Sequence, residues 1–332
     1  KIYLSVILGI LFFVSCKDKK QYYEESGTVF HTLYTIKYEA PHILTDKIDA
    51  ELQKFNLSLN PFNPNSIIAK VNNNEAVEVD EWFTEVFNKS MEVSRNSDGV
   101  FDITCAPLVN LWGFGFNKKD SVTPAMIDSL KTFVGYRKVH LEGKKVVKDD
   151  PRLLLNCSAI AKGYSCDVIA RLLEKEGVEN YMILIGGEVV VKGVNQNGVC
   201  WRTGINLPED DPDGIKNNYD EIVQLCKKGA IATSGNYRNF YIKDGKKYAH
   251  TIDPRTGYPA EQSVLSATIV ANDCMTADAY ATAFMAMGLE KARQMADSLP
   301  EIEYYVIYAD ENGKHQIEYS KGMLQYLPKR KQ

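Results

Sequence analysis

The segment that most constrains the fold is the helix expected at residues 277–287, which is apolar on nearly every face. Such a helix has no side suited to water, so it must be buried in a core. Two exceptions, Asp278 and Thr282, are four residues apart and therefore share one face. A buried carboxylate is costly unless it is paired or binds a cation, and a carboxylate with a hydroxyl suits Mg²⁺. Capping of the helix is the alternative role for Asp278.

Size and charge limit the class of protein. A chain of 332 residues, 45% apolar and 25% charged, can form one large domain or two closely packed ones. Its net charge is −4, and the only dense cationic cluster lies at residues 329–331. Without a basic stripe carrying interleaved aromatic residues, nucleic acid is a poor candidate partner.

The start of the chain predicts a lipoprotein. Lys1 precedes an apolar run at residues 2–15, which is too short for a stable membrane span. The run ends in the letters FVSC, which resemble a bacterial lipobox, so we expect residues 1–16 to be a signal peptide and Cys16 to be lipidated. A plain secretory signal and an anchor are the alternatives. Residues 17–26 would then be a tether, followed by the folded domain at 27–332.

The other cysteines do not form a metal motif. They include no C-x-x-C pair and no histidine at ligand spacing, so neither zinc nor an iron–sulfur cluster is expected. One or two disulfides are possible in an oxidising envelope, but most of these cysteines lie in apolar runs, which favours buried thiols. They are Cys105, Cys157, Cys166, Cys200, Cys226 and Cys274.

Hydrophobic periodicity predicts a mixture of helices and strands without an internal repeat. Helices are expected at residues 43–57, 67–71, 82–94, 123–133, 164–173, 277–288 and 289–298, with Ser66, Thr123 and Thr276 as caps. Strands are expected at residues 27–38, 153–156, 181–187, 188–192, 201–207, 221–225, 229–232, 239–242, 264–270 and 304–309, with hairpins at 137–148 and 315–319.

Three segments are richer in special residues than regular structure requires. Residues 99–115 combine aromatic residues with glycines, which suits a platform for a planar ligand or a buried loop over the core. Residues 153–163 lead from an expected strand through small residues into a helix, an arrangement that often binds anions. Neither a Walker motif nor a G-x-G-x-x-G motif is present, which disfavours nucleotide binding by those two routes.

The third segment, residues 250–259, has the sequence HTIDPRTGYP and predicts a rigid loop. Its prolines fix φ, Gly257 permits a positive φ, and His250 and Asp253 offer a base and an acid. A simple hairpin turn after the preceding strand is the alternative.

Several separated blocks, in a fixed order, resemble the ApbE family of FAD:protein FMN transferases over about residues 27–319. They are SLNPFNPNS, GVFDITCAPLVNLWGFG, LNCSAIAKGYSCDVIA, LIGGEV, TSGNYRNF, HTIDPRTGYP and MTADAYATAF. The resemblance implies an α+β fold related to the T-fold, in which mixed sheets pack with helices in a single catalytic domain.

The resemblance also implies an activity. The family cuts FAD at its pyrophosphate and passes FMN, with Mg²⁺, to a threonine hydroxyl of a partner protein, releasing AMP. Some members hydrolyse FAD to FMN and AMP, so a pyrophosphatase or a carrier that binds FAD intact remains an alternative. Family acceptors include subunits of ion-pumping redox complexes, and with the lipobox this implies a lipid-anchored enzyme of the bacterial cell envelope, its catalytic domain outside the cytoplasm.

Transferred block by block, the resemblance assigns the site residues. The metal ligands would be Asp278, Thr282 and the backbone carbonyl of Ala159. The catalytic residues would be His250 and Asp253, and the sequence leaves open which of them takes the proton of the acceptor hydroxyl. The flavin and adenine contacts would be Phe30, Phe62, Phe101, Asp102, Asn156, Lys162 and Ile252. Phe30 stands where the family has the Met of an M-G-T motif, Phe62 where Tyr is usual, and Asn156 and Lys162 where some members carry acids.

Overall fold

A computed structural model describes residues 20–115, 122–209, 218–237, 240–243, 246–260 and 263–328. Its centre is an eight-stranded sheet in which every pairing of neighbours is antiparallel, in the order β1-β2-β5-β6-β9-β14-β15-β16. The strands are β1 (Gln21–Val29), β2 (Thr32–Ala40), β5 (Tyr181–Ile185), β6 (Glu188–Lys192), β9 (Gly229–Gly235), β14 (Val264–Ala271), β15 (Ile302–Ala309) and β16 (His315–Tyr319).

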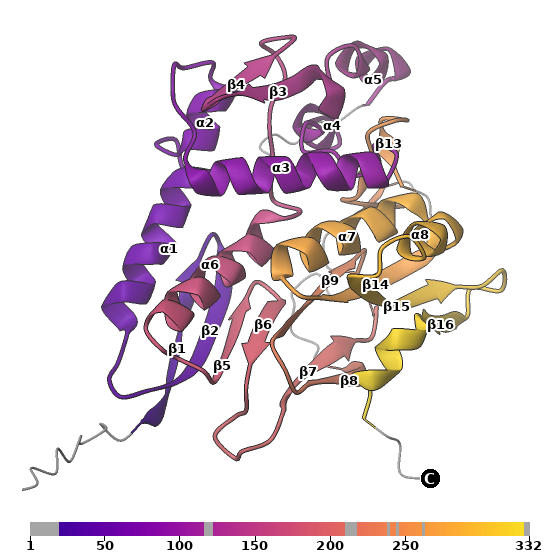
Figure 1. Ribbon diagram of the computed structural model, residues 1–332. Coiled ribbons are helices and arrows are strands. Elements are labelled where there is room, and N and C mark those ends of the chain that lie inside the picture. Colours follow the sequence, from indigo (N-terminus) through magenta and orange to yellow (C-terminus); the bar gives the residue numbers. More distant parts are fainter. Residues whose placement is uncertain are drawn as a thin grey trace, which may run out of the picture.

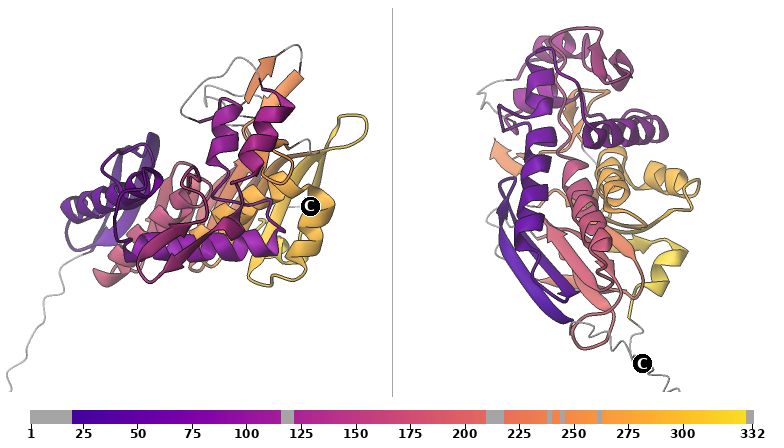
Figure 2. Two further views of the ribbon diagram at one scale, coloured as in Figure 1. Left: turned by 90° about the horizontal axis from the view of Figure 1, so that it is seen from above. Right: turned by 60° about the vertical axis from the view of Figure 1, so that its left-hand side comes forward.

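Helices gather on one face of this sheet (Figures 1 and 2), and four separate two-stranded hairpins complete the described part of the fold. The helices are α1 (Thr45–Leu59), α2 (Ile67–Asn72), α3 (Glu81–Asn96), α4 (Ala106–Leu111), α5 (Pro124–Lys131), α6 (Ala161–Lys175), α7 (Cys274–Met287) and α8 (Leu289–Ala296), with 3-10 turns at Tyr136–Lys138 and Lys321–Gln325. The hairpins are β3 (Val139–Glu142) with β4 (Lys145–Lys148), β7 (Trp201–Asn206) with β8 (Tyr219–Leu225), β10 (Phe240–Lys243) with β11 (Lys246–Ala249), and β12 (Ile252–Asp253) with β13 (Tyr258–Pro259).

Both faces of the sheet are covered, as the side-chain alternation of β6 shows. Val190 packs in the cluster formed with α1 and α6. Val189 and Val191 point the other way, into a cluster with Trp201 of β7. A strand buried on both faces needs a continuous apolar run, which explains the sequence Val189-Val190-Val191.

Helix α7 is enclosed, as predicted. Every one of its residues except Thr282 is buried. It packs against β9, β14, α6 and α3, so neighbours surround it. On the face of α7 that carries the polar pair, Asp278 is therefore buried and Thr282 is partly exposed.

The caps confirm two predictions and correct a third. Ser66 and Thr123 each accept the backbone amide three residues later and start α2 and α5. Thr276 does not cap α7. The cap is Asp273, whose Oδ1 accepts the Thr276 amide at 2.8 Å, while the Thr276 hydroxyl donates to Oδ2 at 3.0 Å. A carboxylate three residues earlier is the better acceptor at a helix start.

The expected strand at residues 27–38 is instead a hairpin. Strands β1 and β2 are joined by the two-residue turn Phe30–His31, where φ is 50° and 60°. This left-handed geometry matches the twist of a hairpin but costs roughly 1–2 kcal/mol for each residue other than glycine. Residues 21–26, which the sequence assigned to a tether, belong to β1.

The expected strand at residues 153–156 is extended but not part of a sheet. Among the described residues, its backbone forms hydrogen bonds with the side chain of Asn72 and with the backbone of Ile103, not with a neighbouring strand. The Leu155 amide donates to Oδ1 of Asn72 at 2.7 Å, and Nδ2 of Asn72 donates to the Leu155 carbonyl at 2.9 Å. The Asn156 amide donates to the Ile103 carbonyl at 2.7 Å. Asn72 thus replaces a neighbouring strand.

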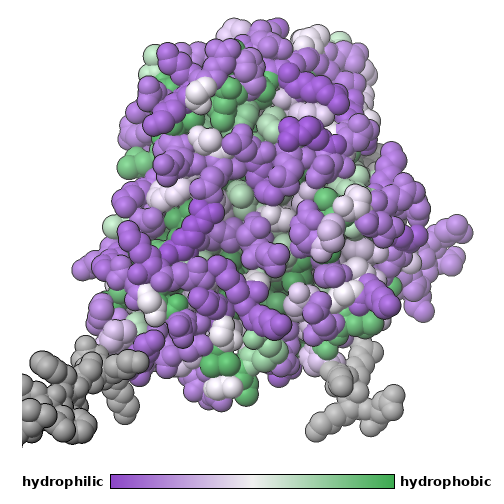
Figure 3. Space-filling view, viewed as in Figure 1, coloured by the Kyte–Doolittle hydropathy of each residue, from purple (hydrophilic) through white to green (hydrophobic). Residues whose placement is uncertain are grey.

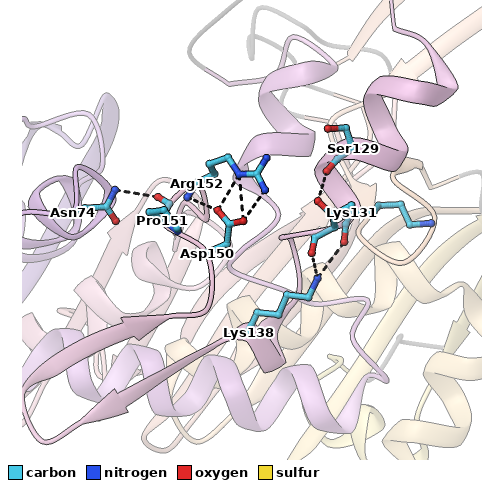
Figure 4. A network of polar contacts seen from close by, with 8 residues as sticks. Asn74, Ser129, Lys131, Lys138, Asp150, Pro151 and Arg152 are labelled. Atoms are coloured by element: carbon cyan, nitrogen blue, oxygen red, sulfur yellow. Dashed lines mark hydrogen bonds and ion pairs between the residues drawn. The ribbon is translucent and has the colours of Figure 1, made fainter.

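Polar contacts near the surface lie at the end of α5 and, separately, in the loop after β4 (Figure 4). Nζ of Lys138 donates to the Lys131 carbonyl at 3.3 Å. Nη2 of Arg152 lies 2.7 Å from Oδ2 of Asp150, and its guanidinium lies 4.5 Å from the centre of the Phe133 ring. Arg152 is exposed, so its ion pair and its aromatic contact are each expected to contribute little to stability.

The cysteines follow the prediction of mostly buried thiols. One disulfide joins the ends of β7 and β8, with Cα atoms 4.5 Å apart. The disulfide is Cys200–Cys226, and the free cysteines of the described residues are Cys105, Cys157, Cys166 and Cys274. The last three are buried.

No helix among the described residues is long and apolar enough to cross a membrane. The predicted signal peptide at residues 1–16, with Cys16, lies outside the described residues, as does the cationic cluster at 329–331.

Candidate functional site

The site is built where the first turn of α6 crosses α7. At the crossing, a Cβ atom on Gly163 would lie 2.2 Å from the Cys274 carbonyl oxygen and 2.7 Å from Cβ of Asp278. No side chain fits there, so glycine allows the two backbones to touch. The motif that contains Gly163 is therefore required by close packing of two helices.

This contact satisfies a free amide at the start of α6. Gly163 is the third residue of α6, and an amide in the first turn has no carbonyl partner within the helix. It donates to Oδ2 of Asp278 at 2.9 Å. No amide of the described residues donates to the carbonyl of Ala159, which lies just before the helix. Burial raises the pKa of Asp278, while the charge of Lys162 and the Gly163 amide lower it.

An ion pair between a half-buried lysine and a buried glutamate lies beside Asp278. Nζ of Lys162 pairs with Oε1 of Glu188, whose side chain is 4% exposed. Oε2 of Glu188 is buried and has no hydrogen-bond partner among the described residues. Burial raises the pKa of Glu188 to about 7, against the opposing charge of Lys162. Burial would lower the pKa of Lys162, but the charges of Glu188 and Asp278 raise it.

Two buried carboxylates thus face one half-buried ammonium, which leaves negative charge for a cation to balance. The carboxylate of Asp278 and the half-buried Thr282 lie on one face of α7, and the Asp278 carboxylate is bound to the start of α6, just after Ala159. These are hard oxygen donors, and Mg²⁺ commonly uses one or two carboxylates and completes its shell with water and substrate phosphates. The residues fit such an ion. No group of three or more His, Cys, Asp or Glu side chains in the described ranges could hold a metal alone.

A carboxylate on α6, that of Asp167, fixes the start of α7. Oδ1 of Asp167 accepts the Cys274 amide at 2.9 Å, and Oδ2 accepts the Met275 amide at 2.8 Å. Burial raises the pKa of Asp167 to about 7, although both amides favour its charged form. Asp167 therefore positions α7, and with it Asp278.

Sequence reasoning missed both Glu188 and Asp167. Each is an acid within an apolar stretch, the first directly after the paired glycines of LIGGEV and the second in the helix segment CDVIA. An acid in such a stretch is rarely fully buried without a partner, so the pairing could have been inferred.

The tip of the β1–β2 hairpin reaches this cluster. Around Gly186, a Cβ atom would meet Cδ of Lys162 at 3.0 Å, Oε2 of Glu188 at 3.1 Å and Cγ2 of Thr32 at 3.1 Å. Phe30, two residues before Thr32, is half-buried and packs against the core.

The aromatic segment at residues 99–115 is partly core. It contains helix α4, which the sequence did not predict. The Phe101 ring is 2% exposed and enclosed by the protein, so its expected contact with flavin is not supported. The oxygens of Asp102 are also engaged: Oδ1 accepts the Thr104 amide and hydroxyl, both at 2.7 Å, and Oδ2 accepts the Tyr136 amide at 2.7 Å. Burial raises the pKa of Asp102.

Asn156 connects this segment to the start of α6. It is half-buried, and its Oδ1 accepts the Ser158 amide at 2.8 Å. Its own amide binds Ile103, one residue after Asp102. The structure therefore brings two of the sequence blocks together.

Residues 250–259 form a tight hairpin, which combines the rigid loop and the turn that the sequence allowed. Asp253 is 7% exposed; its Oδ1 accepts Nε of Arg255 at 3.0 Å and its Oδ2 accepts Nη2 at 2.9 Å. The Gly257 amide donates to the Asp253 carbonyl at 2.8 Å, and φ of Gly257 is 81°. Ile252 is buried with Leu108 of α4.

His250 lies at the start of this hairpin and is half-buried. Its ring is 6.4 Å from that of Phe114, and Nε1 of Trp112 donates to the Gly257 carbonyl at 2.8 Å. The aromatic end of residues 99–115 thus covers the hairpin, and β12 lies against α7.

Three cavities lie elsewhere, with volumes of about 650, 430 and 390 Å³. They lie between α3 and β3, between α2 and β4, and between α1 and α6. Apolar residues gather over β3 and β4 on an otherwise largely hydrophilic face (Figure 3). None of the three is lined by a predicted site residue.

Comparison with known proteins gives a consistent result. The family model described as the ApbE family matches residues 30–306. An FAD:protein FMN transferase of Vibrio cholerae is 35% identical over 307 residues, covering 89% of this chain and 90% of its own length. The protein of the same name from Escherichia coli is 32% identical over 314 residues, covering 88% of each.

Solved structures agree. The flavin transferase ApbE from Vibrio cholerae superposes with a TM-score of 0.83 at 34% identity, covering 93% of this chain and all of that one. A variant of it with one histidine replaced by glycine gives 0.80 at 32% identity, covering 92% and 100%. A Thermotoga maritima ApbE protein gives 0.80 at 28% identity, covering 93% and 100%.

Proposed function

Because the chain belongs to the ApbE family, we propose that it transfers FMN from FAD to a threonine hydroxyl of a partner protein, with Mg²⁺, and releases AMP. Relatives that share about a third of its residues over most of its length carry the name FAD:protein FMN transferase, which supports flavin transfer as its reaction.

The observation that carries the proposal is the crossing of α6 and α7. There the Gly163 amide donates to Oδ2 of Asp278, while no amide of the described residues donates to the Ala159 carbonyl. One oxygen donor of α7 and one of the turn that leads into α6 are thereby available near the Lys162 ammonium. An arrangement of this kind suits a pyrophosphate together with a divalent cation.

Asp278, Thr282 and the Ala159 carbonyl would hold the Mg²⁺, with the FAD phosphates completing its shell. When bound, the ion neutralises charge on the phosphoryl oxygens. Lys162 supplies a second positive charge near the same oxygens. Glu188 keeps that ammonium in position through its buried carboxylate.

The transfer itself joins the threonine oxygen to the FMN-side phosphorus and breaks the pyrophosphate bond to AMP. A threonine hydroxyl ionises poorly at neutral pH, so a base assists. His250 has the chemistry for this role, since histidine changes charge near neutral pH. Asp253 is bound to Arg255 through both oxygens, which supports a role in holding the loop rather than in taking the proton.

A gel assay tests the proposal. The chain is incubated with FAD, Mg²⁺ and a purified, flavin-free acceptor subunit of an ion-pumping redox complex. A parallel sample contains the same subunit with its target threonine replaced by alanine. The expected result is FMN fluorescence that stays on the unaltered subunit after denaturation and is absent from the altered one. Free FMN alone would indicate a pyrophosphatase, and intact FAD would indicate a carrier; either result contradicts the proposal.

We also propose that Cys16 carries lipid and anchors the domain to an envelope membrane. The FVSC sequence after an apolar run supports this. Cys16→Ala should abolish lipid labelling and membrane association in cells while transfer activity is retained. Membrane association that survives the change would contradict the lipid anchor.

A further inference from the structure

The turn of the β1–β2 hairpin holds two bulky residues in a conformation that favours glycine. Phe30 and His31 have φ of 50° and 60°, and Val29 pairs with Thr32 across the turn. Two-residue hairpin turns of this geometry usually carry Asn-Gly or a similar pair. A left-handed conformation of bulky residues indicates that their side chains are held there by other contacts.

The two side chains differ in what holds them. The Phe30 ring lies 5.1 Å from that of Phe55 and packs against the core, so its burial accounts for its conformation. His31 is exposed, and burial cannot account for its conformation. Its ring lies 5.8 Å from that of Phe62, at 80° between the planes.

This edge-to-face contact joins two segments that are distant in sequence. Phe62 lies in a turn where its amide donates to Oδ1 of Asn60 at 3.0 Å, and its side chain is 52% exposed. Thr32, next to His31, approaches the place where Lys162 and Glu188 meet. The pair of rings therefore stands at the edge of the candidate site, and much of the Phe62 ring remains accessible.

We propose that His31 is a positioning residue for the substrate. Its ring supports the Phe62 ring edge to face, so that the accessible side of Phe62 stacks on a planar heteroaromatic ring. This inference rests on the proposed function, since the ring would be the isoalloxazine or the adenine of FAD. Edge-to-face geometry fixes the tilt of a ring, and a fixed tilt lowers the entropic cost of stacking a ligand on it.

Equilibrium binding tests the inference with FAD, FMN and AMP as separate ligands, in the presence of Mg²⁺. His31→Gly removes the ring and suits the positive φ, so the hairpin should remain folded with an unchanged or higher Tm. Its affinity for FAD should fall by about 3- to 10-fold, the range expected for an aromatic pair. His31→Phe, which restores an aromatic edge, should recover most of that loss. A matching loss for FMN identifies the isoalloxazine as the stacked ring, and a loss for AMP identifies the adenine.

Asn74→Gly is the matched control. Asn74 is another residue with positive φ, 59°, and it lies after α2 and away from the site, so its change should leave FAD affinity unaltered. His31→Gly that binds FAD as tightly as the unaltered chain would overturn the inference, as would His31→Phe that is as weak as His31→Gly. If the unaltered chain fails to bind FAD, the proposed function fails, and this inference fails with it.

Discussion

Asp278 and Asp253 are both buried aspartates of the candidate site, 5% and 7% exposed, yet their surroundings differ. Asp253 is matched by its own loop, because the Arg255 guanidinium binds both its oxygens. Asp278 receives one backbone amide and faces the Lys162–Glu188 pair, where a second carboxylate competes for the same ammonium. Asp253, whose charge is matched by Arg255, therefore stabilises its loop. Asp278, which shares one ammonium with Glu188, is left with excess negative charge nearby and is suited to bind a cation.

The comparison extends to the two regions that carry these residues. The α6–α7 crossing is set by backbone contact and buried charge. The hairpin at residues 250–259 is set by a local ion pair and by aromatic cover from Trp112. Changes at the crossing should therefore affect cation binding, and changes in the hairpin should affect proton transfer or loop stability.

The largest effect is expected from Asp278→Asn. The amide side chain can still accept from Gly163, so the helices should stay packed, while a cation ligand and a buried charge are lost. Turnover of FAD dependent on Mg²⁺ should fall below detection without a lower Tm. Asp167→Asn is the comparison variant: it changes a buried carboxylate that positions Asp278 but is not itself a proposed ligand, so it should keep measurable turnover. Full activity in Asp278→Asn would contradict the assignment.

The next largest effect is expected from His250→Asn. If His250 takes the acceptor proton, single-turnover transfer should fall by roughly 10²–10⁴, with FAD affinity near normal. His140→Asn, at an exposed histidine on β3, should change neither quantity. A loss of FAD affinity and thermal stability in parallel with the rate would instead make His250 an anchor of the hairpin.

A smaller effect is expected from Gly163→Ala, because its Cβ would lie 2.2 Å from the Cys274 carbonyl oxygen. The helices must separate, which should cost roughly 1–3 kcal/mol of unfolding free energy and weaken the affinity for Mg²⁺. Gly229→Ala is the matched control, since the nearest atom to its Cβ lies at 3.7 Å. Equal stability of the two variants in urea would refute close contact at the crossing.

How far the sequence could predict this site depends on the residue. The position of Asp278 and Thr282 on one face of a buried helix was predictable, because they are four residues apart in an otherwise apolar segment. The strand expected at residues 153–156 was not correctable from sequence, because its partner is the side chain of Asn72, 83 residues away. The burial of Phe101 and the hydrogen bonds of Asp102 were equally hidden, since both depend on tertiary packing.

The smallest effect concerns pH. Burial raises the pKa of Asp167 to about 7, above an unfolded value near ~3.9, so the folded state binds the extra proton between these values. Its contribution to stability is greatest at low pH and is lost as the pH rises through about 7. Between pH 5 and 8 the unaltered chain should therefore lose more stability in urea than Asp167→Asn. Asp150→Asn, at an exposed group whose pKa is lowered to about 2, should behave like the unaltered chain. Parallel pH profiles for Asp167→Asn and the unaltered chain would contradict this interpretation.

The central claim is that Asp278 binds a cation and Asp253 does not, and calorimetric titration with Mg²⁺ in the presence of FAD tests it most directly. The account predicts that Asp278→Asn weakens Mg²⁺ binding by at least about tenfold, while Asp253→Asn leaves it within about twofold of the unaltered chain. Mg²⁺ binding that survives in Asp278→Asn and is lost in Asp253→Asn would contradict it.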